Sequence, residues 1–200
     1  MSTIGPYSFE QYLKMVEKFH GRVAPGMVTG GFMIDLARRN LPEGTFFDAI
    51  SETTSCLPDT IQLLTPCTIG NGWLRVIDTG RFALTLFEKY GGEGVRVSLD
   101  VEKLEGWPEL KAWFLKLTPK SEQDTKRLLE ELQEAGSGIY RVEHVRVGPE
   151  YLGKQKKKNI RLCARCREPF RSDTEDICPF CTGERAYLSS VDEKGPAGVR

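Results

Sequence analysis

The sequence predicts an α+β domain, built as an antiparallel sheet flanked by helices, followed by a small zinc ribbon with four cysteine ligands. Strand-like segments gather in the middle of the 200-residue chain, and helical segments stand before and after them without regular βαβ alternation. Two CxxC pairs near the C-terminal end predict the ribbon. The chain is therefore expected to be one main domain with a small appendage.

Two helices are predicted at the beginning of the chain. Residues 8–19 form an amphipathic pattern, and Ser8 and Gln11 match a capping box at its start. Residues 27–40 resume helical spacing, and Pro25 can serve as the first helical residue. We expect a break between these two helices.

A pair of glycines, Gly30 and Gly31, lies inside the second predicted helix. Glycine in a helix interior costs about 1 kcal/mol relative to alanine, because the unfolded backbone loses more freedom. A close backbone contact would justify this cost. The pair therefore predicts either tight helix packing or a contact with a functional role.

The middle of the chain is predicted to be strand-rich, with two further helices after it. Residues 78–80 and 91–93 supply turn chemistry between three consecutive strands. Ser121 and Asp124 stand in capping-box spacing, and the helix that they begin ends near Gly136. The expected strands are 46–53, 73–78, 81–90, 94–100 and 139–147, and the expected helices are 58–64, 108–117 and 121–135.

Four segments are expected along the chain. Residues 1–150 form the α+β domain, and residues 151–158, rich in lysine, form a basic linker. Residues 159–188 form the zinc ribbon. Residues 189–200 have nothing to bury and are predicted to be a flexible tail.

Composition excludes several classes of protein. The formal net charge is zero, so the chain as a whole gives no reason to expect nucleic acid or an acidic membrane as partner. No apolar run approaches the roughly 20 residues needed to span a bilayer, and the N-terminus lacks the features of a signal peptide. The cytoplasm is therefore the expected compartment. Thiols stay reduced there, so the six cysteines predict metal ligands or buried thiols rather than disulfides.

The ribbon has the spacing of a structural zinc site. Two CxxC pairs, separated by eleven residues, let two tight turns each offer two thiolates to Zn²⁺. Four sulfurs leave no position for water, so the metal is expected to be structural rather than catalytic. Inert thiols, an iron site of rubredoxin type and a ribbon that contacts nucleic acid remain alternatives. The predicted ligands are Cys163, Cys166, Cys178 and Cys181.

Three upstream residues are candidates for a second metal site. Cys56 precedes a short predicted helix, whose N-terminus favours the thiolate form, and Cys67 opens a glycine-rich turn. His20 lies in a glycine-flanked loop. A His/Cys/Cys set with an open fourth position is the usual sign of a functional metal, although buried structural thiols are the competing interpretation.

The same segments resemble the FmdE family of formylmethanofuran dehydrogenase subunits. The family's pattern is HGHxCPG, then E-x3-C-x2-D-x2-Q, then GCT-x-G-x-G. The chain has FHGRVAPG at residues 19–26 and PCTIGNG at residues 66–72. Between them, the chain matches the second element of the pattern at Glu52, Cys56, Asp59 and Gln62. The resemblance covers roughly residues 8–148, and some members carry a C-terminal zinc ribbon.

The resemblance implies a fold similar to the catalytic domain of glyceraldehyde-phosphate dehydrogenase, without that enzyme's activity. It also implies a metal, a second Zn²⁺ or another divalent ion, held by His20, Cys56 and Cys67. Asp59 and Gln62 would lie behind these ligands or face the substrate. The family's second histidine is Arg22 here, and its loop cysteine is Ala24. Arg22 cannot bind a metal, but its guanidinium can hold a carboxylate or phosphate.

Three functions follow as hypotheses, and the sequence by itself assigns no catalytic residue. The first is a zinc-containing accessory protein of a molybdenum or tungsten dehydrogenase of one-carbon metabolism, which would be its partner. The second is a small metalloenzyme with Asp59 as general base. The third is a regulator that contacts nucleic acid through the ribbon. A homodimer is also expected, because a sheet with an edge and a protruding ribbon can pair.

Overall fold

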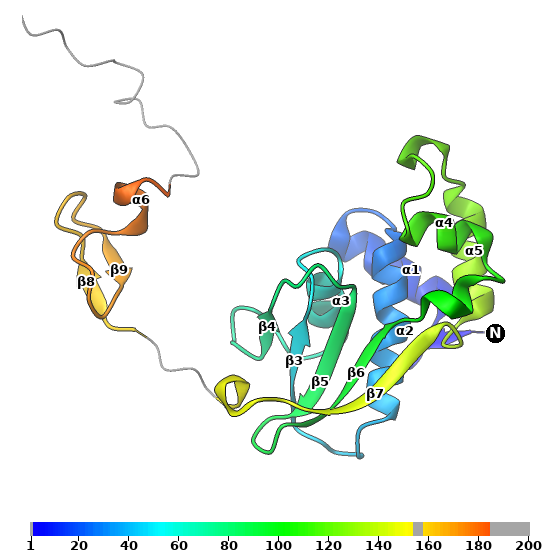
Figure 1. The fold of residues 1–200 in the computed structure, drawn as a ribbon, viewed down its shortest axis with the longest axis horizontal. Coiled ribbons are helices and arrows are strands. Elements are labelled where there is room, and N and C mark those ends of the chain that lie inside the picture. Colours follow the sequence, from blue (N-terminus) through cyan, green and yellow to red (C-terminus); the bar gives the residue numbers. More distant parts are fainter. Residues whose placement is uncertain (1, 154–157, 185–200) are drawn as a thin grey trace, which may run out of the picture. The chain divides into compact units, whose positions relative to one another are not determined.

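The structure is a computed structural model, which describes residues 2–153 and 158–184. The chain divides into two compact units, residues 1–154 and 155–200, and each is treated by itself (Figure 1). Much of the predicted basic linker and all of the predicted tail lie outside the described residues. None of the helices described is long and apolar enough to cross a membrane.

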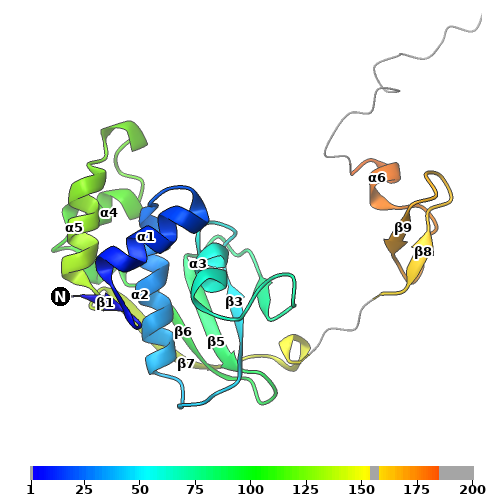
Figure 2. The ribbon, with the colours of Figure 1, turned by 180° about the vertical axis from the view of Figure 1, so that it is seen from behind.

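The first unit is built on a five-stranded sheet with the order β4-β3-β5-β6-β7. Its helices lie over one face of this sheet, as the two opposite views show (Figures 1 and 2). A short hairpin of β1 and β2 precedes α1. The strands are β1 (Thr3–Ile4), β2 (Tyr7–Ser8), β3 (Phe47–Ser51), β4 (Leu74–Val76), β5 (Ala83–Glu88), β6 (Glu93–Leu99) and β7 (Tyr140–Arg146).

The helices follow the predicted order. The α+β class is confirmed, with a central sheet and helices packed against it. The helices are α1 (Phe9–His20), α2 (Pro25–Arg39), α3 (Leu57–Leu64), α4 (Pro108–Phe114) and α5 (Thr125–Ala135), and short 3₁₀ turns occur at Val101–Leu104, Lys120–Glu122 and Pro149–Tyr151.

The sheet is mixed rather than wholly antiparallel. β4 pairs with β3 in parallel, with Ala49 opposite Leu74, and the other three pairings are antiparallel. The reason is that α3 and the loop after it form a crossover from β3 to β4, which a two-residue turn could not supply. The 91–93 turn does join β5 and β6 as a hairpin. The 78–80 turn does not, because β3 lies between β4 and β5.

Capping explains where α1 and α5 begin. The Ser8 hydroxyl accepts from the Gln11 amide at 3.2 Å, and the Gln11 side chain accepts from the Ser8 amide at 2.9 Å. This confirms the predicted capping box of α1. At α5 the predicted start is wrong: Asp124 is the N-cap, its carboxylate accepts from the Arg127 amide at 3.0 Å, and the helix begins at Thr125. A 3₁₀ turn occupies residues 120–122 instead.

The glycine pair in α2 marks two close helix contacts. A side chain at Gly30 would start 2.8 Å from the Thr60 hydroxyl of α3, and one at Gly31 would start 2.7 Å from the Tyr12 ring of α1. Tyr12 is fully buried, and its hydroxyl donates to the Met27 carbonyl at 2.7 Å. The pair therefore serves tight helix packing, which is one of the two interpretations that the sequence allows.

We expect Gly31→Ala to destabilise the first unit by about 1–3 kcal/mol, although alanine is the better helix former. The added methyl group would enter the space of the buried Tyr12 ring, which a hydrogen bond fixes in place. The free energy of unfolding in urea is the measurement. Gly106→Ala is the matched control, because nothing lies within 4 Å of its side-chain position. An unchanged free energy in the Gly31 variant would contradict this packing.

Candidate functional site

The second unit brings the four C-terminal cysteines together. Strands β8 (Ile160–Leu162) and β9 (Pro169–Arg171) form a hairpin, and the short helix α6 (Pro179–Thr182) follows. Cys163 and Cys166 lie in the turn of the hairpin, where Arg167 takes a left-handed backbone conformation with a φ of 67°. Cys178 is the N-cap of α6, and Cys181 lies within that helix. One ligand pair thus comes from a hairpin turn and the other from the single turn of a short helix.

The geometry of the four sulfurs fits zinc. Their Sγ atoms all lie within 4.8 Å of one another. The Sγ atoms of Cys166 and Cys178 are 3.8 Å apart. A tetrahedral Zn²⁺ with Zn–S bonds of about 2.3 Å requires sulfur separations of about 3.8 Å. All four ligand positions are taken by sulfur, so a zinc ion held here is structural and has no open position for water.

Backbone amides near the cluster favour the thiolate form that binds a metal cation. Backbone amides of Cys166, Cys178 and Arg165 lower the pKa of the Cys163 thiol to about 6, against the opposing effect of its burial. The Cys178 amide, for example, donates to the Cys163 sulfur at 3.3 Å. The Arg165 guanidinium donates to the Cys181 carbonyl at 2.6 Å and brings positive charge beside the thiolates. These donors orient the ligands and offset the negative charge of four thiolates on one Zn²⁺.

The three upstream candidates do not form a second cluster of this kind. Among residues 2–153 and 158–184, the four C-terminal cysteines are the one group of three or more histidine, cysteine or carboxylate side chains whose ligand atoms converge. His20 instead pairs with Asp59, and their Nδ1 and Oδ2 atoms are 2.8 Å apart. Cys67 is fully buried, and its thiol donates to the Phe47 carbonyl at 3.5 Å. In this arrangement the donor set does not fit a metal, and a second ion stays a prediction.

Cys56 occupies an unusual backbone position at the start of α3. Its φ is 53°, in a region that residues other than glycine rarely adopt, and the Ser55 carbonyl accepts from the Leu57 amide across it at 2.5 Å. Burial raises the pKa of the Cys56 thiol, and the Asp59 carboxylate raises it further, while Arg22 lowers it less. The expectation of a thiolate is therefore wrong, because burial and the Asp59 carboxylate both favour the neutral thiol. Burial likewise raises the pKa of Cys67 to about 11.

The remaining predicted residues have different roles. Asp59 orients His20, whereas the Gln62 side chain accepts from the Ile69 amide at 3.3 Å and so holds the 66–72 turn against α3. Arg22 is exposed and lines a cleft together with Cys56. His144, the second of the two histidines in the sequence, lies exposed on the edge strand β7. Among the predicted residues, His20, Asp59, Cys56 and Arg22 thus belong to one region, and Cys67 and Gln62 to its structural support.

That cleft has a volume of about 800 Å³. One wall is the loop between α1 and α2, which includes Arg22 and Ala24, and Cys56 lies beside it. The other wall is the segment after α4 together with Trp113. Gly26, at the start of α2, allows the first wall to lie close to Cys56, since a side chain there would begin 2.8 Å from the Cys56 sulfur. No motif pointed to the second wall, because its residues lie about ninety positions further along the chain.

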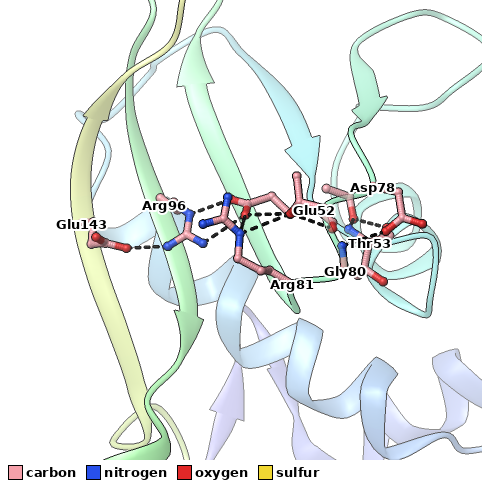
Figure 3. A network of polar contacts seen from close by, with 9 residues as sticks. Glu52, Thr53, Asp78, Gly80, Arg81, Arg96 and Glu143 are labelled. Carbon is pink, nitrogen blue, oxygen red and sulfur yellow. Dashed lines mark hydrogen bonds and ion pairs between the residues drawn. The ribbon is translucent and has the colours of Figure 1, made fainter.

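A charge network around one buried carboxylate supports the loop that leads to Cys56 (Figure 3). Glu52 follows β3 and is 7% exposed. Its carboxylate pairs with Arg96 of β6 at 2.6 Å and with Arg81 at 2.9 Å, and Arg96 also reaches Glu143 of β7 at 2.5 Å. The Thr79 amide donates to the Glu52 carbonyl at 3.0 Å. The sequence identified Glu52 only as part of a motif, and the pairing with two distant arginines needed the sheet.

Comparison with known proteins gives matches for both units. The pattern of the family described as "FmdE, Molybdenum formylmethanofuran dehydrogenase operon" matches residues 19–147. The pattern described as "FmdE treble clef zinc finger" matches residues 154–188. A treble clef has a hairpin turn and a helix start as its two ligand pairs, as observed here, so the finger is of this type rather than a simple ribbon.

Two individual proteins are similar to the chain. One is a tungsten formylmethanofuran dehydrogenase FmdE-like protein from Syntrophus aciditrophicus, known from a crystal structure. It is 50% identical, with a TM-score of 0.86, and the match covers 94% of this chain and 98% of that one. The other is a probable S-adenosyl-L-methionine-binding protein from Archaeoglobus fulgidus, 29% identical over 86% of this chain. This chain spans only 52% of that relative's length.

We expect about one zinc per chain, and Cys178→Ser to lose it, because three sulfurs and a hydroxyl hold Zn²⁺ far less tightly than four thiolates. Zinc binding supplies most of the folding energy of so small a unit, so the variant's second unit should also become protease-sensitive. Elemental analysis and limited proteolysis are the measurements. Cys56→Ser is the matched control and should keep its zinc. Full zinc content in the Cys178 variant would contradict the proposed ligand set, and two zinc ions per wild-type chain would reveal a second site.

We expect Glu52→Gln to lower the free energy of unfolding by about 1–3 kcal/mol at pH 7, because it leaves two arginines without their shared carboxylate. Burial raises the pKa of Glu52, but Arg96 and Arg81 outweigh it and hold the pKa below its ordinary value. The stabilisation is thus present above the unfolded pKa of about 4.3, and is lost as pH falls through the lower folded value. The difference from wild type should therefore shrink below about pH 4.

Denaturant unfolding at several pH values measures this difference. Glu93→Gln is the matched control, because its ion pair with Arg146 is exposed and long, at 3.4 Å. An equal loss of unfolding free energy in the two variants at pH 7 would show that the Glu52 network stabilises the fold no more than an exposed ion pair does.

Proposed function

The chain belongs to the FmdE family and carries that family's treble-clef zinc finger, and on this basis we propose that it is an accessory protein of a molybdenum- or tungsten-containing dehydrogenase of one-carbon metabolism. The Syntrophus relative is described as FmdE-like, after a tungsten formylmethanofuran dehydrogenase, and it matches this chain over nearly its whole length. Association with dehydrogenase subunits, like the expected homodimer, is part of this proposal.

The observation that carries the proposal is the closed centre of four cysteines in a separate unit. A metal with four sulfur ligands binds no substrate, so its contribution is to the shape of the finger. A unit of this size cannot fold on an apolar core alone, and the metal supplies the missing free energy. A finger that is stabilised in this way, next to a domain with its own core, suits a contact module for another protein.

The rest of the chain also favours an accessory role. An iron–sulfur cluster with only cysteine ligands needs four thiolates, and only Cys56 and Cys67 remain outside the finger. Both thiols have raised pKa values, and Cys67 is fully buried against the Phe47 carbonyl. The electron transfer of a dehydrogenase would therefore take place in another subunit, and this chain would bind, deliver or regulate.

A small metalloenzyme is a second candidate function, and one observation favours it. The Asp59 carboxylate bonds to His20 Nδ1, and no residue among those described forms a hydrogen bond with Nε2. Metal-ligating histidines are commonly oriented in this way by a carboxylate. The cysteines do not complete the site, since Cys67 points its thiol at a backbone carbonyl. For this reason we derive no reaction through a metal at His20.

A nucleic-acid-binding regulator has less support from the finger. Arg161 pairs with Asp176 at 2.5 Å, and Arg165 donates to the Cys181 carbonyl at 2.6 Å. Both arginines thus stabilise the finger itself instead of presenting free charge to phosphates. Arg167 and Arg171 are exposed. The S-adenosylmethionine binding in the name of the Archaeoglobus relative is not carried over, because this chain matches about half of that protein.

The proposal predicts that the affinity-tagged full chain captures a molybdenum- or tungsten-containing oxidoreductase from extracts of its native host. Elemental analysis of the eluate and identification of the captured subunits are the measurements. The Cys178→Ser variant, in which the finger is disrupted, should retain about a tenth or less of the captured metal, since one lost contact surface of about 3 kcal/mol lowers affinity more than a hundred-fold.

Cys56→Ser serves as the matched control and should capture as much as wild type. Molybdenum and tungsten at background level with the wild-type chain would refute the proposal. Retention on DNA that falls steeply with salt, with no oxidoreductase captured, would instead support the regulator.

A further inference from the structure

The cleft beside Cys56 has an unbalanced set of charges. Three cationic side chains line it, Arg22 from the loop between α1 and α2, and Lys116 and Lys120 from the segment after α4. Within the part of the chain that the structure describes, no carboxylate lines the cleft. The whole chain has equal numbers of acidic and basic residues, so this imbalance is local.

Several other cations of the first unit are neutralised by an ion pair. Arg39, Lys89 and Lys111 each lie within 2.8 Å of a carboxylate oxygen. By contrast, in residues 2–153 and 158–184 no carboxylate oxygen lies within 4.0 Å of Arg22, Lys116 or Lys120. The nearby Asp59 is already engaged by His20. The cleft therefore offers unneutralised positive charge to a ligand.

Apolar surface lies beside this charge. The Trp113 side chain is half-buried and lines the cleft, and Leu117 is 62% exposed there, which is high for a leucine. Behind them, Phe114 packs edge-on against Phe82 with ring centroids 6.3 Å apart. Phe82 in turn reaches within 3.7 Å of the Gly26 side-chain position. The two walls are thus joined by a packed aromatic layer, and the cleft is part of the fold rather than a gap between loops.

We propose that this cleft binds an organic anion of small-molecule size, in which a carboxylate or phosphate is joined to an aromatic or apolar group. The anion would lie on Arg22, whose planar guanidinium can hold two oxygens at once, with Lys116 and Lys120 adding charge. The apolar group would lie on Trp113 and Leu117. A volume of about 800 Å³ suits such a ligand, since small-molecule pockets span about 300–1,000 Å³.

Cys56 is compatible with an anionic ligand in the cleft. Because burial raises the pKa of its thiol, the side chain is neutral and does not repel a carboxylate or phosphate. Ala24, whose side chain is a single methyl group, lines the cleft together with Cys56 and adds no charge to it. The residues that line this cleft all belong to the first unit, and the inference does not depend on the accessory role.

Two dyes that differ in charge test the inference on the full chain. The probes are 8-anilino-1-naphthalenesulfonate, which is anionic, and N-phenyl-1-naphthylamine, which is neutral. We expect the sulfonate to bind in the cleft, and Arg22→Gln to weaken it about ten-fold, as expected for one lost charge-assisted hydrogen bond. The neutral dye should change by less than about two-fold. Trp113→Phe should lower the energy transfer to the dye without abolishing it, because Trp73 and Trp107 remain.

Lys126→Gln is the matched control, because Lys126 lies on α5 with an 89% exposed side chain and does not line the cleft. The inference fails if this control weakens the sulfonate as much as Arg22→Gln does, or if both dyes respond equally to Arg22→Gln. Displacement of the dye by phenyl phosphate or by benzoate then distinguishes a phosphate ligand from a carboxylate ligand. Displacement by neither compound would overturn the assignment. Thermal unfolding of each variant confirms that the exposed substitutions leave the fold intact.

Discussion

The first unit depends on the close approach of α2 to its neighbours. Gly26 and Gly30, one helical turn apart, leave room for Cys56 and Thr60 of the α3 region, and Gly31 leaves room for the Tyr12 ring of α1. These contacts fix α1 and α3 on one face of the sheet. They also place the loop before α2 against Cys56, so the cleft is a consequence of helix packing.

The two units are stabilised by different means. The first unit has an apolar core. An ion pair between Glu52, which follows β3, and Arg96 of β6 adds a polar contact across the sheet. In residues 158–184, the described part of the second unit, Phe170 and Phe180 are the apolar side chains that pack around the cysteines, so a metal is expected to supply most of the folding free energy. Loss of zinc and loss of the core are therefore separable, which allows the contribution of the finger to be measured in the intact chain.

The chemistry of the chain divides in the same way. The finger fits a zinc ion whose four ligand positions are all occupied by sulfur. Such a metal binds no substrate, so the finger would act through its surface. The cleft keeps a neutral thiol, a histidine–carboxylate pair nearby and three unneutralised cations, which favours ligand binding. At position 22 the family pattern has a histidine, which can bind a metal, and this chain has an arginine. The arginine cannot bind a metal, but it can bind an anion.

Local chemistry could be deduced from the amino-acid sequence alone. Ser8 and Gln11 cap α1, the two CxxC pairs predict the zinc site, and Gly30 and Gly31 predict a close contact, because each signal lies within a few residues. The parallel pairing of β4 with β3 became evident only in the folded chain, because a crossover is defined by where the chain returns. The same holds for the burial of Cys67 against a carbonyl and for the distant cations that line one cleft, since burial and long-range pairing depend on the whole fold.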